Sequence, residues 1–261
     1  MNGFLQIFFY VIVSSLLLTL GIPNEFFIFG SPILGLFSLV PVYLAIEKCK
    51  SHKMAAFATS LQFVLTHIFS SFWLGNFKGF AIFTLGGSAL FYFLVGLAFG
   101  LVLYLPFSNK KNNFFVIQKN QFFIPFRIIY FASVWTIYEW YKSVGFLAYP
   151  WGTVLMTAYS WKIFTQIVSI VGTFGITFLF SLFSSTVAEG ILILRDFPRK
   201  TFSNYNFTAA FCITLFALSG IYGAFTYTQN RTPVKTFDAV LVQQNADSWE
   251  DGNSTSTIKK A

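Results

Sequence analysis

The 261-residue chain is 56% hydrophobic and 21% aromatic, only 10% of its residues are charged, and its mean hydropathy is +0.67. These values lie far from the averages of soluble domains and exclude a soluble globular protein. The net charge of +8 falls in the connections between apolar runs, which argues against nucleic-acid binding.

Seven apolar runs are long enough to cross a hydrocarbon core of about 30 Å, which takes about 20 helical residues. They are Phe4–Leu20, Phe27–Ile46, Met54–Trp73, Phe80–Leu105, Phe122–Tyr141, Ile163–Leu194 and Phe207–Phe225. We therefore expect an all-α polytopic membrane bundle of about seven transmembrane helices, spanning residues 1–226. No positive charge precedes the first run and no clear cleavage site follows it, so we expect an anchor and not a removable signal peptide.

Positive charge concentrates in every second connection. The three clusters are Lys48, Lys50 and Lys53; Lys110, Lys111, Lys119 and Arg127; and Arg195, Arg199 and Lys200. The other connections carry only Lys78, Lys142 and Lys162, with Glu25 in the first. By the positive-inside rule, the N-terminus is expected to be cytoplasmic and the segment after the seventh run extracytoplasmic.

Small residues at helical spacing predict close packing at Gly96–Gly100 and at Gly172–Gly175. Residues 143–161 contain Pro150 and are too irregular for a span, so we expect them at the outer membrane interface. Aromatic side chains surround this segment, either as an interfacial belt or as an entrance for an acyl chain. They are Trp135, Trp140, Trp151 and Trp161 with Tyr149 and Tyr159.

The chain changes character after the seventh run. Residues 227–236 form a polar linker with Pro233, and residues 237–261 begin with a predicted strand, Ala239–Val242. Asn253, Ser254 or Thr255 can cap a following helix. One strand and a helix stub cannot bury their apolar faces against each other, so these residues predict the beginning of a soluble α/β domain.

Glu139 lies well inside the fifth run, and an acid at membrane depth is by default a candidate functional residue. Lys142, three residues on, gives an equally good structural explanation, because an i,i+3 ion pair or a snorkelling lysine accounts for the acid without catalysis. Trp249 follows the predicted strand. It is either covered by the rest of its domain or used in contact with a lipid or an acceptor peptide.

His67 lies in the third run beside Thr66 and two serines, where a hydrogen-bonded structural role is more common than a proton relay. Cys49 and Cys212 have neither a metal-ligand companion nor a disulfide-like spacing, and we expect both to be structural thiols. No metal site and no cofactor are predicted.

Several of these residues, taken in order, resemble the bacterial apolipoprotein N-acyltransferases. The similar elements are Trp135, Glu139-Trp140, Lys142, Gly145-Phe146 and Pro150-Trp151, then Tyr159, Gln166 and Gly172-Thr-Phe-Gly175, and finally VLVQQN at 240–245 with Trp249. The resemblance covers about half of the chain. It implies that residues 237–261 open a nitrilase-like (carbon–nitrogen hydrolase) domain.

The resemblance also implies a function. Family members transfer an acyl chain from a phospholipid such as phosphatidylethanolamine to the α-amino group of the diacylglyceryl-modified cysteine of apolipoproteins, in the bacterial cytoplasmic (inner) membrane. A Glu-Lys-Cys triad forms a thioacyl-enzyme, and no residue of this chain matches that triad, so residues 1–261 alone are expected to be inactive. By resemblance, Trp249, Glu139, Phe146 and Trp151 are the candidate substrate-binding residues.

Two other interpretations are open. A transporter or lipid-binding membrane module is also compatible with seven helices and an intramembrane acid, but it predicts paired broken helices or internal repeats, and the sequence indicates neither. A truncated or degenerate membrane protein without catalysis is the other.

Overall fold

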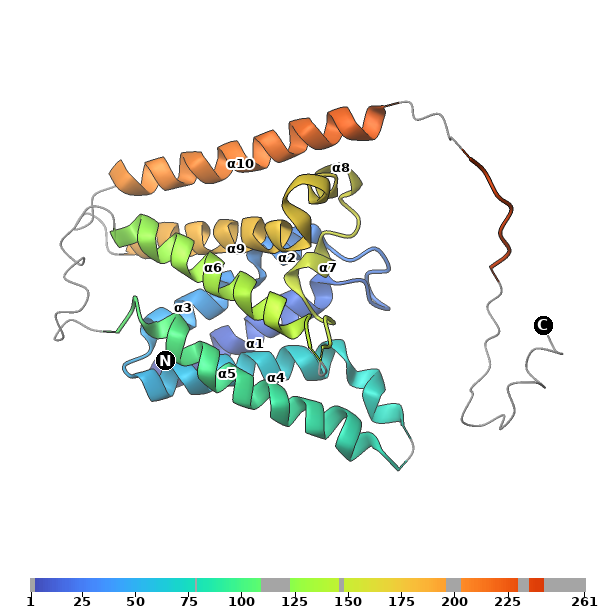
Figure 1. Cartoon of the computed structure of the whole chain (residues 1–261). Helices are drawn as coiled ribbons and strands as arrows, with labels where there is room; N and C mark the ends of the chain where they lie inside the picture. The colour runs from blue at the N-terminus through green and yellow to red at the C-terminus, as the bar shows by residue number, and fades with distance from the viewer. Residues whose placement is uncertain are drawn as a thin grey trace. The chain divides into compact units, whose positions relative to one another are not determined.

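The computed structural model describes residues 3–77, 79–108, 123–145, 148–195, 203–229 and 235–241. The chain divides into two compact units, Met1–Thr228 and Gln229–Ala261. In the first unit the described segments are helices joined by turns and short loops, as Figure 1 shows.

The helices are α1 (Gly3–Gly21), α2 (Pro32–Ser38), α3 (Val40–Lys48), α4 (His52–Ser70), α5 (Ser88–Tyr104), α6 (Phe123–Lys142), α7 (Val154–Thr157), α8 (Lys162–Thr165), α9 (Val168–Arg195) and α10 (Ser203–Thr228), with a 3₁₀ helix at Phe72–Asn76 and a π-helix at Ile82–Gly87. Within the described residues, four stretches are long and apolar enough to cross a membrane: Gly3–Gly21, Ile82–Tyr104, Val168–Arg195 and Asn204–Thr228. The protein is therefore a multi-pass helical membrane bundle.

Two more helices, α4 and α6, have the length of a span but a more polar sequence, with 19 and 20 residues. Their polar side chains lie inside the bundle. In α4 the buried polar residues include Thr59, Gln62 and His67, and in α6 they include Glu139 and Lys142. Burial against other helices explains how α4 and α6, which fall in two of the seven predicted runs, accommodate these polar residues.

The second predicted run is not one continuous helix. It forms α2 and α3, with the chain breaking just before Pro41, which has no backbone N–H to donate. Side chains from other helices satisfy the carbonyls freed at the break. Ser184 Oγ donates to the Leu36 carbonyl at 2.5 Å, and Ser14 Oγ donates to the Ser38 carbonyl at 2.7 Å.

The sixth predicted run is also interrupted. It consists of the short α8 and the long α9, and α9 is kinked at Gly172, whose backbone has φ 69° and ψ 177°. This left-handed conformation suits glycine. The Gly172–Gly175 pattern therefore marks a kink. The prediction that it provides close packing between helices is wrong, because a Cβ at Gly172 would meet no atom within 4 Å and one at Gly175 would meet only Val171 of the same helix.

The Gly96–Gly100 pattern does provide close packing, between α5 and α4. A Cβ added at Gly96 would lie 2.4 Å from Ser60 Cα, and one at Gly100 would lie 2.7 Å from Ala56 Cα. Ser60 Oγ also donates to the Phe93 carbonyl at 2.8 Å across the same interface. Small residues let the two backbones approach closely, as the sequence predicts.

The core of the bundle is aromatic. Its largest fully buried side chains include Trp135, Tyr43 and Phe63. Phe63 stacks on Tyr138 with the ring centroids 3.8 Å apart, and Trp135 meets Phe63 edge-on at 5.7 Å. Such pairs add to the packing energy that holds α4 against α6.

The described part of the second unit is residues 235–241, which have neither helix nor strand hydrogen bonding. Ala239, Val240 and Leu241 of the predicted strand lie here, and the predicted helix stub lies outside the described residues. A strand needs neighbouring strands to satisfy its backbone. The strand therefore stays a prediction.

The α4–α5 interface predicts the effect of a single methyl group. Gly96→Ala should force the two helices apart and lower the free energy of unfolding by about 1–3 kcal/mol. Gly220→Ala is the matched control, since a Cβ at Gly220 meets no atom within 4 Å. Thermal unfolding in detergent measures both, and equal melting temperatures for the two variants would contradict the close approach.

Candidate functional site

The segment that follows α6 is irregular, as the sequence predicts, and it positions the candidate site. Its backbone turns at Gly152, where φ is 71°, before the short helices α7 and α8. A Cβ at Gly152 would lie 2.6 Å from Ser70 Oγ, so the segment lies tightly against the end of α4. In Figure 1, α7 and α8 lie at the end of the bundle where α6 ends and α9 begins.

Glu139 connects α6 to two other elements. Its side chain is buried, and its Oε1 accepts a hydrogen bond from the backbone N–H of Val154, the first residue of α7, at 2.7 Å. Its Oε2 accepts from Thr177 Oγ1 of α9 at 2.8 Å. Hydrogen bonds to both oxygens fix the position of the carboxyl group.

Lys142 does not form the expected i,i+3 ion pair with Glu139. Its ammonium group lies over the ring of Tyr92, with Nζ 4.9 Å from the ring centroid. Nor does the side chain snorkel to solvent, because only 5% of Lys142 is exposed. Within the described residues, the salt bridges are Arg127–Glu189 and Arg195–Glu47. Glu139 is therefore held by neutral donors.

Trp151 is anchored to the end of α4. Its Nε1 donates to the Ser70 carbonyl at 2.7 Å, and its ring meets Trp73 edge-on with the centroids 6.3 Å apart. Tyr149 makes a parallel connection, since its hydroxyl donates to Ser71 Oγ at 3.1 Å. Burial raises the pKa of Tyr149, so this hydroxyl stays protonated and available as a donor at neutral pH.

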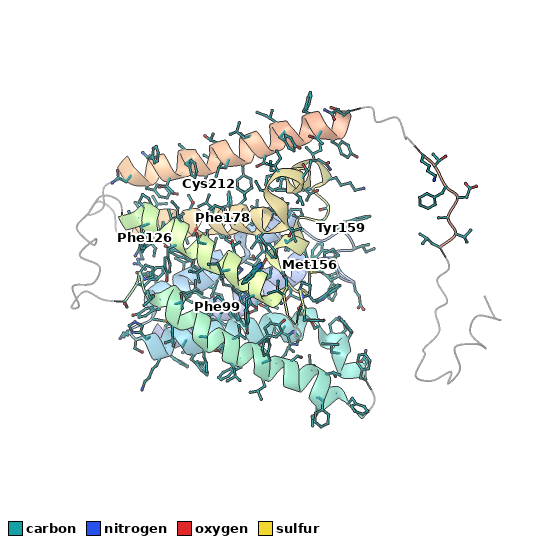
Figure 2. All side chains as sticks on the ribbon, viewed as in Figure 1. Phe99, Phe126, Met156, Tyr159, Phe178 and Cys212 are labelled. Carbon is teal, nitrogen blue, oxygen red and sulfur yellow. The ribbon has the colours of Figure 1, made fainter. Side chains whose placement is uncertain are left out.

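A cavity of about 480 Å³ lies between these elements. Glu139, Thr177 and Thr173 supply polar groups to its lining, and Trp151, Met156 and Phe174 supply apolar surface. Met156 belongs to α7 and is labelled in Figure 2. A concave site with apolar walls and a few converging polar groups is typical of small-molecule binding. The cavity brings together two of the four predicted substrate-binding residues, Glu139 and Trp151, while Phe146 and Trp249 lie outside the described residues.

The predicted aromatic cluster divides into two groups. Trp140 is 50% exposed and Tyr159 61% exposed, as expected of side chains that meet lipid and headgroups. Trp135 is fully buried among Phe63, Phe131 and Tyr138, so the prediction that it belongs to an interfacial belt is wrong. The sequence does not show which face of α6 points inward at this position.

His67 has the structural role that the sequence favours. The side chain is buried, its Nε2 lies 2.7 Å from Ser88 Oγ of α5, and its ring packs on Tyr92 with the centroids 4.6 Å apart. The partner is a serine from another helix and not one of the neighbouring hydroxyl residues in α4. No group of three His, Cys, Asp or Glu side chains among the described residues could hold a metal ion.

The two cysteines are buried. Cys49 lies between α3 and α4, and burial raises the pKa of its thiol to about 12. A thiol with a raised pKa is a poor nucleophile at neutral pH, because the thiolate is the reactive form. Cys212 of α10 is 3% exposed. Both positions agree with the predicted structural role.

A second buried carboxylate, Glu189 in α9, does not figure among the candidates from sequence. It forms an ion pair with Arg127 of α6 and accepts a hydrogen bond from the hydroxyl of Tyr43 in α3. Arg127 is therefore inside the bundle, with its guanidinium carbon 5.1 Å from the ring centroid of Phe107. The sequence could have indicated this pair, because Glu189 lies inside the sixth apolar run and Arg127 inside the fifth, where charged residues are rare and usually paired.

The chain matches the family model of the apolipoprotein N-acyltransferase N-terminal domain over residues 14–186. It is 37% identical over 257 residues to apolipoprotein N-acyltransferase 2 of Treponema denticola, covering 97% of this chain and 46% of that protein. It is 41% identical over 239 residues to apolipoprotein N-acyltransferase 2 of Treponema pallidum, covering 91% and 40%.

A third relative, the apolipoprotein N-acyltransferase of Borreliella burgdorferi, is 28% identical over 250 residues, covering 94% of this chain and 44% of the relative. The chain thus spans less than half the length of these curated relatives. No solved structure matches the chain.

The Glu189 cluster predicts a large cost for removing one charge. Arg127→Met should leave Glu189 buried and uncompensated and destabilise the protein by about 3–5 kcal/mol. Adding Glu189→Leu should recover part of this loss. The control is Arg195→Met at the partly exposed Arg195–Glu47 pair, where we expect a change of about 1 kcal/mol or less. Thermal unfolding in detergent compares the stabilities of the variants. An Arg127→Met protein that is no less stable than the Arg195→Met control would contradict the ion pair.

Proposed function

The chain belongs to the apolipoprotein N-acyltransferase family, and from this premise we propose that it is the membrane part of an enzyme that acylates lipoproteins. The acyl chain comes from a phospholipid, and the acceptor is the α-amino group of the diacylglyceryl-modified cysteine of an apolipoprotein. The observation that carries this proposal is the similarity, over 91–97% of the chain, to two relatives named as this enzyme.

The proposed topology has seven membrane crossings. Besides the four apolar stretches, it counts α4, α6 and the broken pair α2–α3. Contacts near the basic clusters support a common cytoplasmic end. Arg195 at the end of α9 pairs with Glu47 at the end of α3, and the Tyr104 hydroxyl at the end of α5 donates to the Cys49 carbonyl. In Figure 1 the start of α6 and the end of α9 lie at the same end of the bundle.

The opposite end of the bundle then faces the extracytoplasmic leaflet of the bacterial inner membrane. We place substrate binding there, at Glu139 and Trp151, because the cavity between α6, α7 and α9 lies at this end. Phe146 and Trp249 belong to the same proposed site by family resemblance. Residues 237–261 are proposed to open a nitrilase-like domain, with the predicted strand Ala239–Val242 as its first element.

Residues 1–261 alone are proposed to be inactive. A thioacyl-enzyme needs an accessible cysteine whose thiolate a neighbouring group stabilises. Cys49 and Cys212 are buried, and burial raises the pKa of the Cys49 thiol to about 12. Neither thiol suits nucleophilic attack on a phospholipid ester.

The transporter interpretation gains one observation, since α2–α3 is a broken helix and α9 is kinked. Transporters use the backbone groups freed at such breaks to coordinate substrates or ions. Here the Leu36 and Ser38 carbonyls already accept hydrogen bonds from Ser184 and Ser14. The break is therefore satisfied by the protein itself, and the acyltransferase proposal is the better supported.

The topology predicts which residues an impermeant thiol reagent reaches from outside the cell. With Cys49 and Cys212 replaced by serine, a cysteine introduced by Tyr159→Cys should be labelled in intact spheroplasts, while one introduced by Lys50→Cys should be labelled only after lysis. Both parent side chains are exposed. The reverse pattern would contradict the orientation, and labelling of both before lysis would contradict a sealed bundle between them.

A chimera tests the proposed activity. Residues 1–261 are joined to the part of the Treponema denticola relative that follows its matching region, and the product is incubated with phospholipid and a diacylglyceryl-cysteinyl peptide. We expect the mass of the peptide to rise by one acyl chain. The relative serves as the positive control, and residues 1–261 alone should give no product.

Two results would contradict the proposed activity of the enzyme or the proposed inactivity of residues 1–261. A folded, membrane-inserted chimera that leaves the peptide unchanged while the relative acylates it would argue against the acyltransferase assignment of this membrane part. Acylation by residues 1–261 alone would overturn the argument from the two buried thiols.

A further inference from the structure

We propose that the Glu139 cavity binds the primary ammonium group of an amphiphilic substrate, with Glu139 as the residue that selects it. The proposal rests on the acyltransferase function to the extent that it calls the ligand a substrate. The binding itself follows from the contacts and surroundings of the Glu139 carboxyl group.

The carboxylate keeps part of its acceptor capacity for a ligand. Glu139 is only 2% exposed, and its two oxygens accept from the Val154 N–H and the Thr177 hydroxyl, both of which are neutral. A carboxylate has about four acceptor positions. Because the side chain lines the cavity, a ligand there meets a fixed acceptor in a poorly solvated setting. An ammonium group bound at this acceptor favours the ionised carboxylate, because an opposite charge nearby stabilises the charged form.

The nearest cation along α6 does not take this place. Lys142 is not among the residues that line the cavity, and its Nζ lies over the Tyr92 ring. Its positive charge acts on Glu139 from a distance beyond ion-pair contact. Among the described residues that line the cavity there is no lysine, arginine or histidine, so a cation at the carboxylate has to come from a ligand.

The walls of the cavity suit an alkylammonium group attached to apolar chains. Trp151, Tyr149 and Phe174 give aromatic surface, which attracts cations through the ring face, while Leu155 and Met156 are apolar. The volume of about 480 Å³ fits a small-molecule head group. Exposed Trp140 and Tyr159 place this end of the bundle at the depth of lipid head groups.

Two amphiphiles carry such a group. One is an aminophospholipid, whose ethanolamine head group ends in a primary ammonium. The other is a lipid-modified peptide with a free α-amino group. Each has an N-acetylated counterpart that keeps the acyl chains and loses the positive charge. Comparing each amine with its N-acetylated form shows which of the two amphiphiles the cavity binds through its ammonium group.

The experiment measures binding by native mass spectrometry of the purified 261-residue chain. Phosphatidylethanolamine is titrated against its N-acetyl derivative, and a diacylglyceryl-cysteinyl peptide against its N-acetyl form. We expect at least one amine to bind about tenfold more tightly than its acetylated partner, as one charge-assisted hydrogen bond provides. Glu139→Gln should abolish this preference. Glu25→Gln, which removes an exposed carboxylate in the first loop, should leave it unchanged.

Each outcome decides the proposal. A preference seen in the lipid pair identifies a head-group site, and one seen in the peptide pair identifies an acceptor site. No preference in either pair, or a preference that persists in folded Glu139→Gln protein, overturns the proposal. If that variant does not fold, Met156→Trp fills the cavity and leaves the carboxylate intact, and an unchanged preference in this variant overturns it as well.

This readout is independent of catalysis. If the chimera transfers no acyl chain but the amine preference depends on Glu139, the ammonium site stands and the proposed function fails. If the chimera is active while neither pair shows a preference, the function stands and the ammonium site fails.

Discussion

The carboxylate of Glu139 is the contact on which the end of the bundle around α7 depends. Through one side chain it joins α6 to the first residue of α7 and to Thr177 of α9. The segment between α6 and α9 is too irregular to satisfy its own backbone, so its position is set by such side-chain contacts. Trp151 adds a second attachment through the Ser70 carbonyl, and the Tyr92 hydroxyl adds a third by donating to the Tyr149 carbonyl. The cavity exists because these contacts hold the segment against α4, α6 and α9 at once.

The same requirement, that no buried backbone group be left without a partner, explains why the interior is rich in hydroxyl side chains. Where Pro41 interrupts the second run, Ser184 and Ser14 supply the missing donors. Hydroxyls also link intact helices, as Ser15 does by donating to the Gln62 carbonyl of α4 at 3.2 Å. A membrane bundle gains little from the hydrophobic effect between helices, so close packing and such hydrogen bonds carry the association. The lower hydropathy of α4 and α6 follows from this, because their polar groups face other helices.

Hydropathy predicts α1, α5 and α10 well, because each is a single apolar helix with few buried polar groups. The break before Pro41 could have been predicted from the proline, whereas the kink at Gly172 could not, since Gly96 and Gly100 are also a closely spaced glycine pair and lie in a regular helix. The partners of Glu139 lie 15 and 38 positions away, and the partner of Glu189 at Tyr43 lies 146 positions away. Contacts of this range depend on how the helices face one another, which spacing within one helix does not give. For the same reason an i,i+3 pair with Lys142 was a reasonable prediction that the structure does not contain.

The two buried glutamates, Glu189 and Glu139, have different surroundings. Glu189 meets a positive charge and a hydroxyl within the protein, so its charge is compensated where it lies and its effect is to hold α3, α6 and α9 together. Glu139 meets a backbone N–H and a hydroxyl, which orient it without neutralising it, and it borders a cavity. Burying an uncompensated charge is costly, and a sequence that needed only a structural link between α6, α7 and α9 could make it with glutamine at lower cost. The proposed ammonium ligand would supply the compensating charge that the helices around Glu139 do not.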